Sequence, residues 1–164
     1  MTMREMLERA AQVVWPDPHI RWMIRRDMEA VLAIERVCFA PPRTEEALID
    51  LLKNRAVIGM VIERGEQVRG FMIYELHKCR MHLLDFAVDP EHQRQGLGRQ
   101  MLFKLKDKLS PCRRTGLSAI VPESNLPAQL FFQAQGFRCI GIKPGCFAPA
   151  NAEPENGYRF VYTI

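Results

Sequence analysis

The segment Gln93–Gly98, with the sequence QRQGLG, has the residue types that a phosphate-binding turn needs. It contains two glycines, Arg94 and Arg99 lie beside them, and it overlaps the start of Leu97–Leu109, whose apolar spacing predicts a helix. The first N–H groups of a helix lack intrahelical partners and lie at the positive end of its dipole. Because glycine has no Cβ, the backbone here can approach a phosphate closely. The segment therefore predicts a phosphate site, with an ordinary tight turn as the alternative.

The spacing of this segment excludes two common phosphate motifs. Neither the G-x-x-x-x-G-K-[ST] pattern of P-loops nor the G-x-G-x-x-G pattern of dinucleotide-binding folds is present. The spacing instead resembles the Q/R-x-x-G-x-G/A signature of the GNAT superfamily of N-acetyltransferases, with Gln93, Gly96 and Gly98 at its fixed positions. The preceding run Phe86–Pro90 resembles the acyl-CoA-binding strand of that superfamily.

A second block downstream resembles the later motif of the same superfamily, N-x-x-A-x-x-x-Y-x-x-x-G-F. Together the two blocks cover Leu83–Phe137, and the segment Phe86–Arg99 looks most like the ribosomal-protein-alanine N-acetyltransferase (RimI) group. The positions that match the later motif are Asn125, Ala128, Phe132, Gly136 and Phe137.

The resemblance implies an acetyl-CoA site and no metal. In the superfamily, the pantetheine arm pairs with exposed backbone of the fourth strand and the pyrophosphate binds the loop N–H groups. The asparagine of the later motif contacts the cofactor. An amine then attacks the thioester directly in a ternary complex, while a backbone N–H, here near Val88, polarises the carbonyl. The implied cofactor contacts are Phe86, Ala87, Val88, Gln93, Arg94, Gln95, Gly96, Leu97, Gly98, Arg99, Asn125 and Phe132.

Two positions depart from the superfamily pattern, so the resemblance supplies no acid and no base. The usual acid, a tyrosine, is replaced by Phe132, which has no proton to donate. The usual base of the RimI group, a glutamate, is replaced by Ile120. Proton transfer through water, without a dedicated acid, therefore stays open beside a replacement from another strand.

Four side chains on two adjacent predicted strands are candidates for the missing groups. His82 is the first candidate base, because histidine titrates near neutral pH. Simple alternation places Asp85 on the opposite face of the same strand, unless a bulge intervenes. Tyr74 and Glu75, on the neighbouring strand, could reach the acceptor groove. A partly exposed strand histidine, a packing tyrosine and a solvent-facing glutamate are the alternative interpretations.

The coarse element order is β-α-α-β-β-β-α-β-α-β-β, which predicts a mixed sheet with helices on both faces. The resemblance to the GNAT superfamily implies an α/β (α+β) fold with about seven mostly antiparallel strands, splayed at strands four and five. Residues 1–18 are predicted to form a helical extension of a single domain, 19–164. The predicted elements include strands at Ile20–Ile24, Val57–Ile62, Val68–Leu76, Met81–Val88, Gly116–Val121, Phe137–Ile142 and Tyr158–Ile164, helices at Leu97–Leu109 and Leu126–Ala134, and a loop at Pro144–Asn156.

Composition limits the remaining possibilities. The chain has 164 residues with a net charge of +4, which fits one domain and lacks the strong charge of a dedicated nucleic-acid binder. Its five cysteines are odd in number and none has C-x-x-C spacing, so reduced thiols are expected. Without a secretory h-region or a long apolar run, the chain is expected to be cytoplasmic and not membrane-bound. A monomer or a homodimer fits equally.

The acceptor stays open at this stage. The leading hypothesis is acetylation of a protein N-terminal α-amine, with nucleic acid met only indirectly through a ribosomal substrate. Acetylation of a small amine or a lysine is the second hypothesis. Phe132 and Ile120 motivate a third, an acyl-CoA-binding module that no longer catalyses. A basic RNA-binding domain is a fourth, and it predicts strongly salt-dependent affinity.

Overall fold

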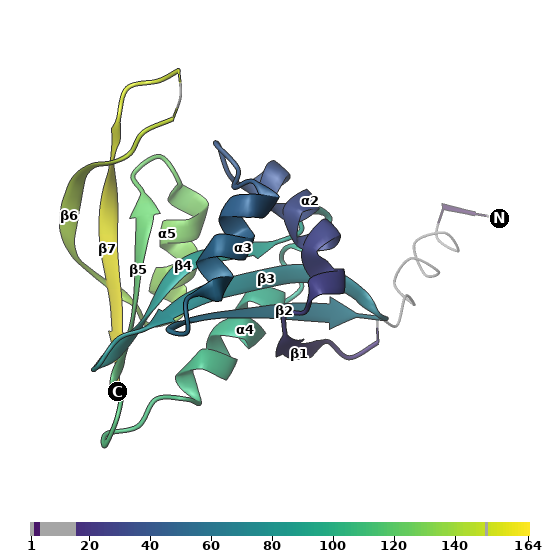
Figure 1. Ribbon diagram of the computed structural model, residues 1–164, viewed down its shortest axis with the longest axis horizontal. Helices are drawn as coiled ribbons and strands as arrows, with labels where there is room; N and C mark the ends of the chain where they lie inside the picture. The colour runs from purple at the N-terminus through teal and green to yellow at the C-terminus, as the bar shows by residue number, and fades with distance from the viewer. Residues whose placement is uncertain (1, 4–15, 150) are drawn as a thin grey trace.

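Seven strands form one mixed sheet in the order β1-β2-β3-β4-β5-β7-β6 (Figure 1). The computed structural model describes residues 2–3, 16–149 and 151–164. Neighbouring strands are antiparallel except β4 and β5, which are parallel, so the predicted mostly antiparallel sheet is confirmed. The strands are β1 (His19–Trp22), β2 (Val57–Arg64), β3 (Gln67–Leu76), β4 (Arg80–Val88), β5 (Gly116–Pro122), β6 (Arg138–Phe147) and β7 (Glu155–Thr163).

Helices cover both faces of the sheet, and each face has its own apolar cluster (Figure 1). On one face, Val31 of α2 and Leu48 of α3 pack on Phe71 and Ile73 of β3. On the other face, α4 and α5 pack on the opposite side of the same strands. The helices are α2 (Met28–Cys38), α3 (Glu45–Lys53), α4 (Leu97–Lys106) and α5 (Leu126–Ala134), with 3-10 turns η1 (Arg25–Asp27) and η2 (Pro90–His92).

A β-bulge interrupts β4 in its middle. Tyr74 of β3 lies opposite Leu83, whereas Ile73 lies opposite Asp85, so Leu84 is an extra residue. A bulge of this kind places two consecutive side chains on one face. Leu84 accordingly packs in the cluster under α2 and α3, and Asp85 lies on that face as well. The expectation that Asp85 and His82 lie on opposite faces is therefore wrong, because the bulge cancels the alternation.

β4 and β5 separate immediately beyond this bulge. The two strands pair only from Arg80 opposite Gly116 to Leu83 opposite Ala119. From Leu84 to Val88, β4 has no strand partner on its β5 side within the residues that the structure describes. The predicted splay at strands four and five is present, and it starts at the bulge.

The largest departure from the predicted elements lies between the last two strands. Pro144–Asn156 was expected to be a loop because it is rich in proline, alanine and asparagine. Instead β6 continues to Phe147 and β7 begins at Glu155, so the segment between the strands is shorter. The pairing register of β6 and β7 shifts on both sides of Lys143. Pro144 therefore lies in β6 at a place where the hydrogen-bond ladder is irregular, which a residue without an N–H group tolerates.

Smaller departures concern element ends. α4 ends at Lys106 rather than Leu109. Asp27 occupies the N-cap position of α2, but its side chain makes no cap bond to that helix. Its carboxylate accepts bonds from the Arg21 guanidinium and from the backbone N–H of Ile24 instead. The helix expected over Met1–Val14 lies almost wholly outside the described residues. All five cysteines are free, as their spacing indicated. In the part of the chain that the structure describes, no helix has the length and apolarity required to span a bilayer.

Candidate functional site

The phosphate-binding candidate is a glycine at the start of α4. Gly96 is the N-cap residue, with φ of 82° in the left-handed region that glycine adopts without strain. A Cβ built at Gly96 would meet no atom within 4 Å, so the backbone there faces open space. The first turn of α4 contains no acidic residue. Free N–H groups, a positive helix end and an absent Cβ together fit an anionic phosphate.

Side chains of the loop hold its shape rather than point to a ligand. Gln93 Nε2 donates to the Val88 carbonyl oxygen at 3.0 Å. Arg64 of β2 donates to Gln95 Oε1 at 2.6 Å, which ties the loop to the neighbouring part of the sheet. Arg94 also lies in the left-handed region, with φ of 60°. Gln93 and Gln95 therefore act on any cofactor through the backbone that they fix.

Gly98 serves close packing. A Cβ at Gly98 would lie 3.2 Å from Cζ of Phe131 and 3.6 Å from Cε1 of Phe86. The first turn of α4 therefore sits directly against these two rings. The two glycines of the motif thus have different physical reasons: Gly96 frees the backbone for approach from outside, and Gly98 lets α4 approach α5.

The unpaired edge of β4 presents backbone groups beside this helix start. Asp89 N–H donates to the carbonyl oxygen of Arg69 in β3 at 2.7 Å. Because backbone groups of successive residues alternate between the two sides of a strand, those of Val88 and Phe86 face the unpaired side. The Val88 carbonyl oxygen accepts bonds from Gln93 and from the Cys38 thiol, the latter at 3.6 Å. The N–H groups on this edge can pair with an extended amide-bearing chain.

Aromatic rings form the wall opposite this edge. Phe86 of β4 lies 5.8 Å from Phe131 and 6.1 Å from Phe132 of α5, between ring centroids. Phe132 is only 5% exposed and also packs on Phe137 and Phe160. Phe132 lies beside Phe86 at the splay, where a residue at this position of the later motif is expected. Because it is buried, its ring can only form part of an apolar wall. Asn125 caps α5, because its Oδ1 accepts from Ala128 N at 3.2 Å.

The opposite face of the splay carries a polar cluster centred on His82. His82 Nδ1 lies 2.8 Å from Ser118 Oγ of β5, and the two residues are paired in the parallel register. Leu117 and Ala119 point into the cluster under α4, so Ser118 and Ile120 point to the face of α2 and α3. Ile120, which replaces the glutamate of the RimI group, is thus about 7 Å along the strand from Ser118. His82 therefore lies on the same face as the position of the missing base.

Glu75 and His77 complete the cluster. Glu75 lies opposite His82 across β3 and β4, and its Oε2 is 3.0 Å from Nε2 of His77. The rings of His77 and His82 are 6.2 Å apart and close to perpendicular. Glu75 thus shares the face of His82, as expected, but its carboxylate is engaged by His77.

The surroundings of His82 favour its neutral form. Burial lowers the pKa of His82 below its usual 6.5, and the neighbouring His77, Arg80 and Lys143 lower it further against the opposing charge of Glu75. A neutral imidazole is the form that can accept a proton. If Nδ1 donates to Ser118 Oγ, the lone pair of Nε2 is free for that purpose.

The other two catalytic candidates lie in different surroundings. Tyr74 is 2% exposed in the apolar cluster beneath α4, and its hydroxyl lies 3.8 Å from Met60 Sδ. Tyr74 was a candidate to reach the acceptor groove; alternation instead directs its side chain to the face opposite His82. Asp85 is on the face of His82, but it is 6% exposed and accepts two bonds from Arg43. Neither Arg43 nor Ser118 was identified from the sequence, although alternation with Ile120 points to Ser118.

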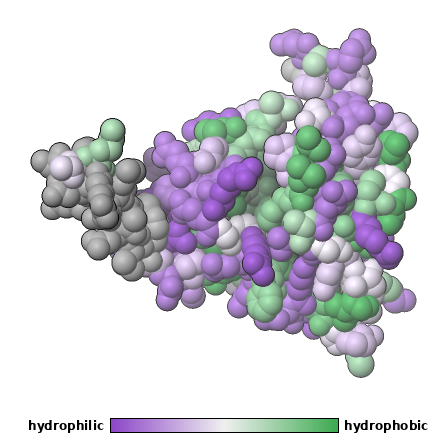
Figure 2. All heavy atoms as spheres, turned by 180° about the vertical axis from the view of Figure 1, so that it is seen from behind, coloured by the Kyte–Doolittle hydropathy of each residue, from purple (hydrophilic) through white to green (hydrophobic). Residues whose placement is uncertain are grey.

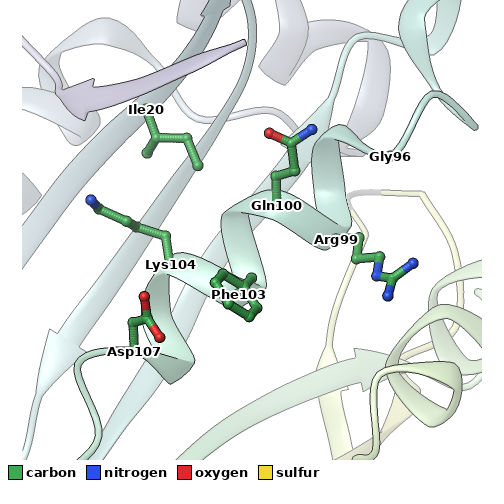
Figure 3. Close-up of a pocket in the computed structure, with 7 residues that line it drawn as sticks. All are labelled: Ile20, Gly96, Arg99, Gln100, Phe103, Lys104 and Asp107. Atoms are coloured by element: carbon green, nitrogen blue, oxygen red, sulfur yellow. The ribbon is translucent and has the colours of Figure 1, made fainter. Parts of the chain in front are cut away.

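A cavity of about 540 Å³ lies along the exposed side of α4 and touches the loop at Gly96. Gln100 and Lys104 extend toward Ile20 of β1, whereas Arg99 extends to the other side of the helix (Figure 3). From the reverse side of the molecule, a hollow near the middle of the surface is bordered by hydrophilic and hydrophobic side chains (Figure 2). The cavity includes no residue of the β4 edge, so it adjoins the candidate cofactor site without containing it.

Potential metal ligands occur together at one place in the described part of the chain. Donor atoms of Asp89, Glu91 and His92 lie within 4.8 Å of one another. Asp89 accepts from the Glu91 N–H at 3.1 Å and lies 3.4 Å from Nδ1 of His92, so local bonds account for the group. Its place in the turn before the loop requires no metal.

Comparison with known proteins agrees with this geometry. Residues 28–137 match the family model of the Acetyltransferase (GNAT) family. The chain is 31% identical over 117 residues to the [ribosomal protein bS18]-alanine N-acetyltransferase of Escherichia coli K12, covering 71% of this chain and 78% of that protein. It is 25% identical over 139 residues to the protein of the same name from Haemophilus ducreyi, covering 84% and 94%.

Solved structures share the fold. The ribosomal-protein-S18-alanine N-acetyltransferase of Escherichia coli has a TM-score of 0.78 at 24% identity, covering 90% of this chain and 94% of that one. Arabidopsis thaliana NAA60 in complex with acetyl-CoA has a TM-score of 0.78 at 16% identity, covering 90% and 99%. At these identities the likeness concerns the fold alone.

Proposed function

This chain belongs to the GNAT family of acetyltransferases, and from that premise we propose that it moves the acetyl group of acetyl-CoA to a protein N-terminal α-amine. It is an acyltransferase of that family; the donor and the acceptor are the proposed parts. The observation that carries the proposal is that two binding features of the backbone lie next to each other, since Gln93 of the loop donates to Val88 of the β4 edge. The free helix start at Gly96 and the unpaired β4 edge from Leu84 to Val88 adjoin, so one extended ligand with a phosphate end fits both.

Acetyl-CoA matches these two features in its chemistry. Its pyrophosphate suits the N–H groups after Gly96, with Arg94 and Arg99 beside them. Its pantetheine amides suit the N–H and C=O groups of Phe86 and the N–H group of Val88. The rings of Phe131 and Phe132 form an apolar wall that excludes water from the thioester. When bound, acetyl-CoA supplies the activated acyl group; the protein supplies binding, orientation and proton transfer.

The acceptor assignment draws on the named relatives. Proteins called [ribosomal protein bS18]-alanine N-acetyltransferase match the chain over most of their length, and that name specifies an α-amine on a protein. The acceptor is proposed to bind on the face of α2 and α3, because His82 and Ser118 lie on that face. Any further ribosomal contact would be made through the substrate.

His82 is proposed as the general base. A protein α-amine is largely protonated at neutral pH, because its ordinary pKa is about 8. It must lose a proton before or during attack, and neutral His82 has Nε2 available when Nδ1 donates to Ser118. The backbone N–H groups on the β4 edge would polarise the thioester carbonyl. Glu75 contacts His77, and these two residues have opposite effects on the pKa of His82.

The leaving thiolate has no tyrosine at the usual position. Phe132 is buried among other rings and carries no proton. The tyrosines of β7, Tyr158 and Tyr162, pack against the cluster under α4 and α5. Water is therefore proposed as the proton source. Since a thiol is far more acidic than an alcohol, protonation of the leaving group is the less demanding of the two proton transfers.

The test combines binding with turnover. Isothermal titration with acetyl-CoA measures the donor site, and thiol release measures transfer to a panel of acceptors. The panel contains a peptide with a free N-terminal alanine, the same peptide with a blocked N-terminus and one internal lysine, and a small primary amine. Turnover on the free N-terminus alone supports the proposal. Turnover only on the blocked peptide or the small amine would redirect it to those acceptors.

The second candidate function is an acyl-CoA-binding module without catalysis. Phe132 and Ile120 favour it, because both standard proton-transfer side chains of the family are missing. Tight acetyl-CoA binding without thiol release on any acceptor would select it. No acetyl-CoA binding at all would refute both candidates.

A further inference from the structure

Arg43 connects the α2–α3 loop to the middle of β4. Its Nε donates to Asp85 Oδ2 at 2.7 Å and its Nη2 donates to Asp85 Oδ1 at 3.1 Å, which is a two-pronged ion pair. Asp85 is 6% exposed, whereas the Arg43 side chain is 37% exposed. The guanidinium thus reaches inward from a surface loop and neutralises a buried carboxylate.

The same loop is tied to α2 by a second buried carboxylate. Glu35 is 2% exposed, and its Oε1 accepts from the backbone N–H of Arg43 at 3.0 Å. The other oxygen of Glu35, Oε2, has no hydrogen-bond partner within the described residues. Burial raises the pKa of Glu35, and the charge of Asp85 raises it further against the bond from Arg43. Arg43 therefore contacts both buried acids, Asp85 through its guanidinium and Glu35 through its backbone N–H.

The ion pair acts at the residue where β4 becomes free. Leu84 is the bulged residue, Leu83 is the last one paired with β5, and Asp85 is the first beyond the bulge. The bulge is what turns Asp85 toward Arg43; without it, alternation would direct that carboxylate into the apolar cluster under α4. The pair and the bulge consequently stabilise each other, and together they fix the start of the unpaired edge.

We propose that Arg43 is a positioning residue for acetyl transfer: through Asp85 it holds the β4 bulge, and with it the backbone edge that orients the thioester against His82. This inference rests on the proposed function. Arg43 acts through Asp85 and the strand, so it contributes to orientation and not to proton transfer. Since small displacements of reacting groups cost large factors in rate, its loss should appear in kcat more than in acetyl-CoA affinity.

The molecule supplies a control at one edge of the sheet. Arg21 of β1 makes a similar two-pronged pair with Asp27, at 2.7 and 2.8 Å, and Asp27 is 3% exposed. Arg21 also donates to Glu63 Oε2 at 3.1 Å. This cluster lies at the edge strand, three positions from β4 in the sheet order. Arg21→Gln should therefore cost at least as much stability as Arg43→Gln without touching the β4 edge.

The experiment measures three quantities in the full chain for Arg43→Gln, Arg43→Lys, Asp85→Asn and Arg21→Gln. They are kcat per folded protein with the peptide acceptor, the acetyl-CoA Kd from titration, and amide hydrogen exchange of Leu84–Val88. Arg43→Gln is expected to lower kcat by about 10- to 100-fold with the Kd changed by less than about threefold, and to speed exchange by about tenfold. Lysine keeps the charge without the fork, so Arg43→Lys should fall between.

Each outcome decides the proposal. Asp85→Asn should match Arg43→Gln, and the double variant should be no worse than either, because the two residues act as one unit. If Arg43→Gln and Arg43→Lys lower only thermal stability, as Arg21→Gln does, with kcat and exchange unchanged, the positioning role is wrong. If the parent protein acetylates no amine, the proposed function fails, while the exchange rates still decide whether Arg43 holds the strand.

Discussion

The two faces of the splayed sheet differ in what holds their functional groups. On the α4 and α5 face, the proposed donor side is made of backbone groups: the helix start at Gly96 and the edge of β4 at Val88. On the α2 and α3 face, the proposed acceptor side is made of side chains, centred on His82 and Ser118. A site made of backbone groups depends on the local conformation of one segment. A site made of side chains depends on which helices and strands pack together. This difference explains why the donor side agrees with the family pattern while the acceptor side departs from it.

The largest effect is expected on the donor side, from Gly96→Asp. A carboxylate beside the pyrophosphate repels it, and at a few ångströms that repulsion suffices for a loss of acetyl-CoA affinity on the order of 100-fold. Gly96→Asn is the control, because asparagine has the same shape, tolerates the left-handed backbone and carries no charge. Titration with acetyl-CoA is the measurement. Equal affinity of the parent and Gly96→Asp would remove the loop from the donor site.

The next effect is expected on the acceptor side, from His82→Gln. Loss of a general base typically costs a factor of about 100, so kcat/KM at neutral pH should fall by that order with acetyl-CoA affinity unchanged. Because the pKa of His82 is lowered, the acidic limb of the parent profile should lie below pH 6.5. In the variant this limb should be replaced by one near the ordinary α-amine pKa of about 8, because the amine must then lose its proton to solvent. Groups around the ring, namely Glu75, His77, Arg80 and Lys143, will shift the midpoint of the parent limb. A limb that stays below pH 6.5 in His82→Gln would assign it to another group.

A smaller effect is expected from Ser118→Ala, which tests whether a change on the α2 and α3 face leaves acetyl-CoA binding on the other face unaffected. Ser118 is 3% exposed and bonds to Nδ1 of His82, so its loss should relax the ring and its tautomer. We expect about a tenfold loss of kcat, comparable to one hydrogen bond, with donor affinity kept. The double variant with His82→Gln should show no further loss. Additive losses would mean that Ser118 acts independently of His82.

The smallest effect concerns stability, from Glu35→Gln. The pKa of Glu35 is raised, so the folded protein holds this proton more tightly than the unfolded chain, and stability falls as pH rises above 4.5. Glutamine keeps an oxygen for the Arg43 N–H without the charge. At pH 8 it should stabilise the fold by about 1 kcal/mol, and the gain should vanish below pH 4.5. Denaturant titrations at both pH values provide the check, and a gain that is the same at both would show that charge is not its cause.

Much of the donor side could be predicted from the sequence, because it depends on local rules. Gly96 before an apolar-periodic helix specifies a free helix start wherever the helix packs. The order of elements follows from hydrophobic periodicity, and the predicted sheet is confirmed with small differences at element ends. The largest difference, at Pro144–Asn156, arose because composition indicated a loop while pairing with β7 extended β6 through Phe147.

The acceptor side shows what only the tertiary structure decided. One inserted residue, Leu84, turned Asp85 to the face of His82, and no alternation rule could place that bulge. Parallel pairing of β4 with β5 brought Ser118 to His82, and the α2–α3 loop brought Arg43 to Asp85 on the face that α2 and α3 cover. These contacts join residues distant in sequence, so their energies depend on packing rather than on local spacing. The sequence by itself determined the glycine-led helix start at Gly96, which is proposed to bind phosphate, and the order of elements around it. The bulge, the splay and the side chains that face them were decided by how those elements pack.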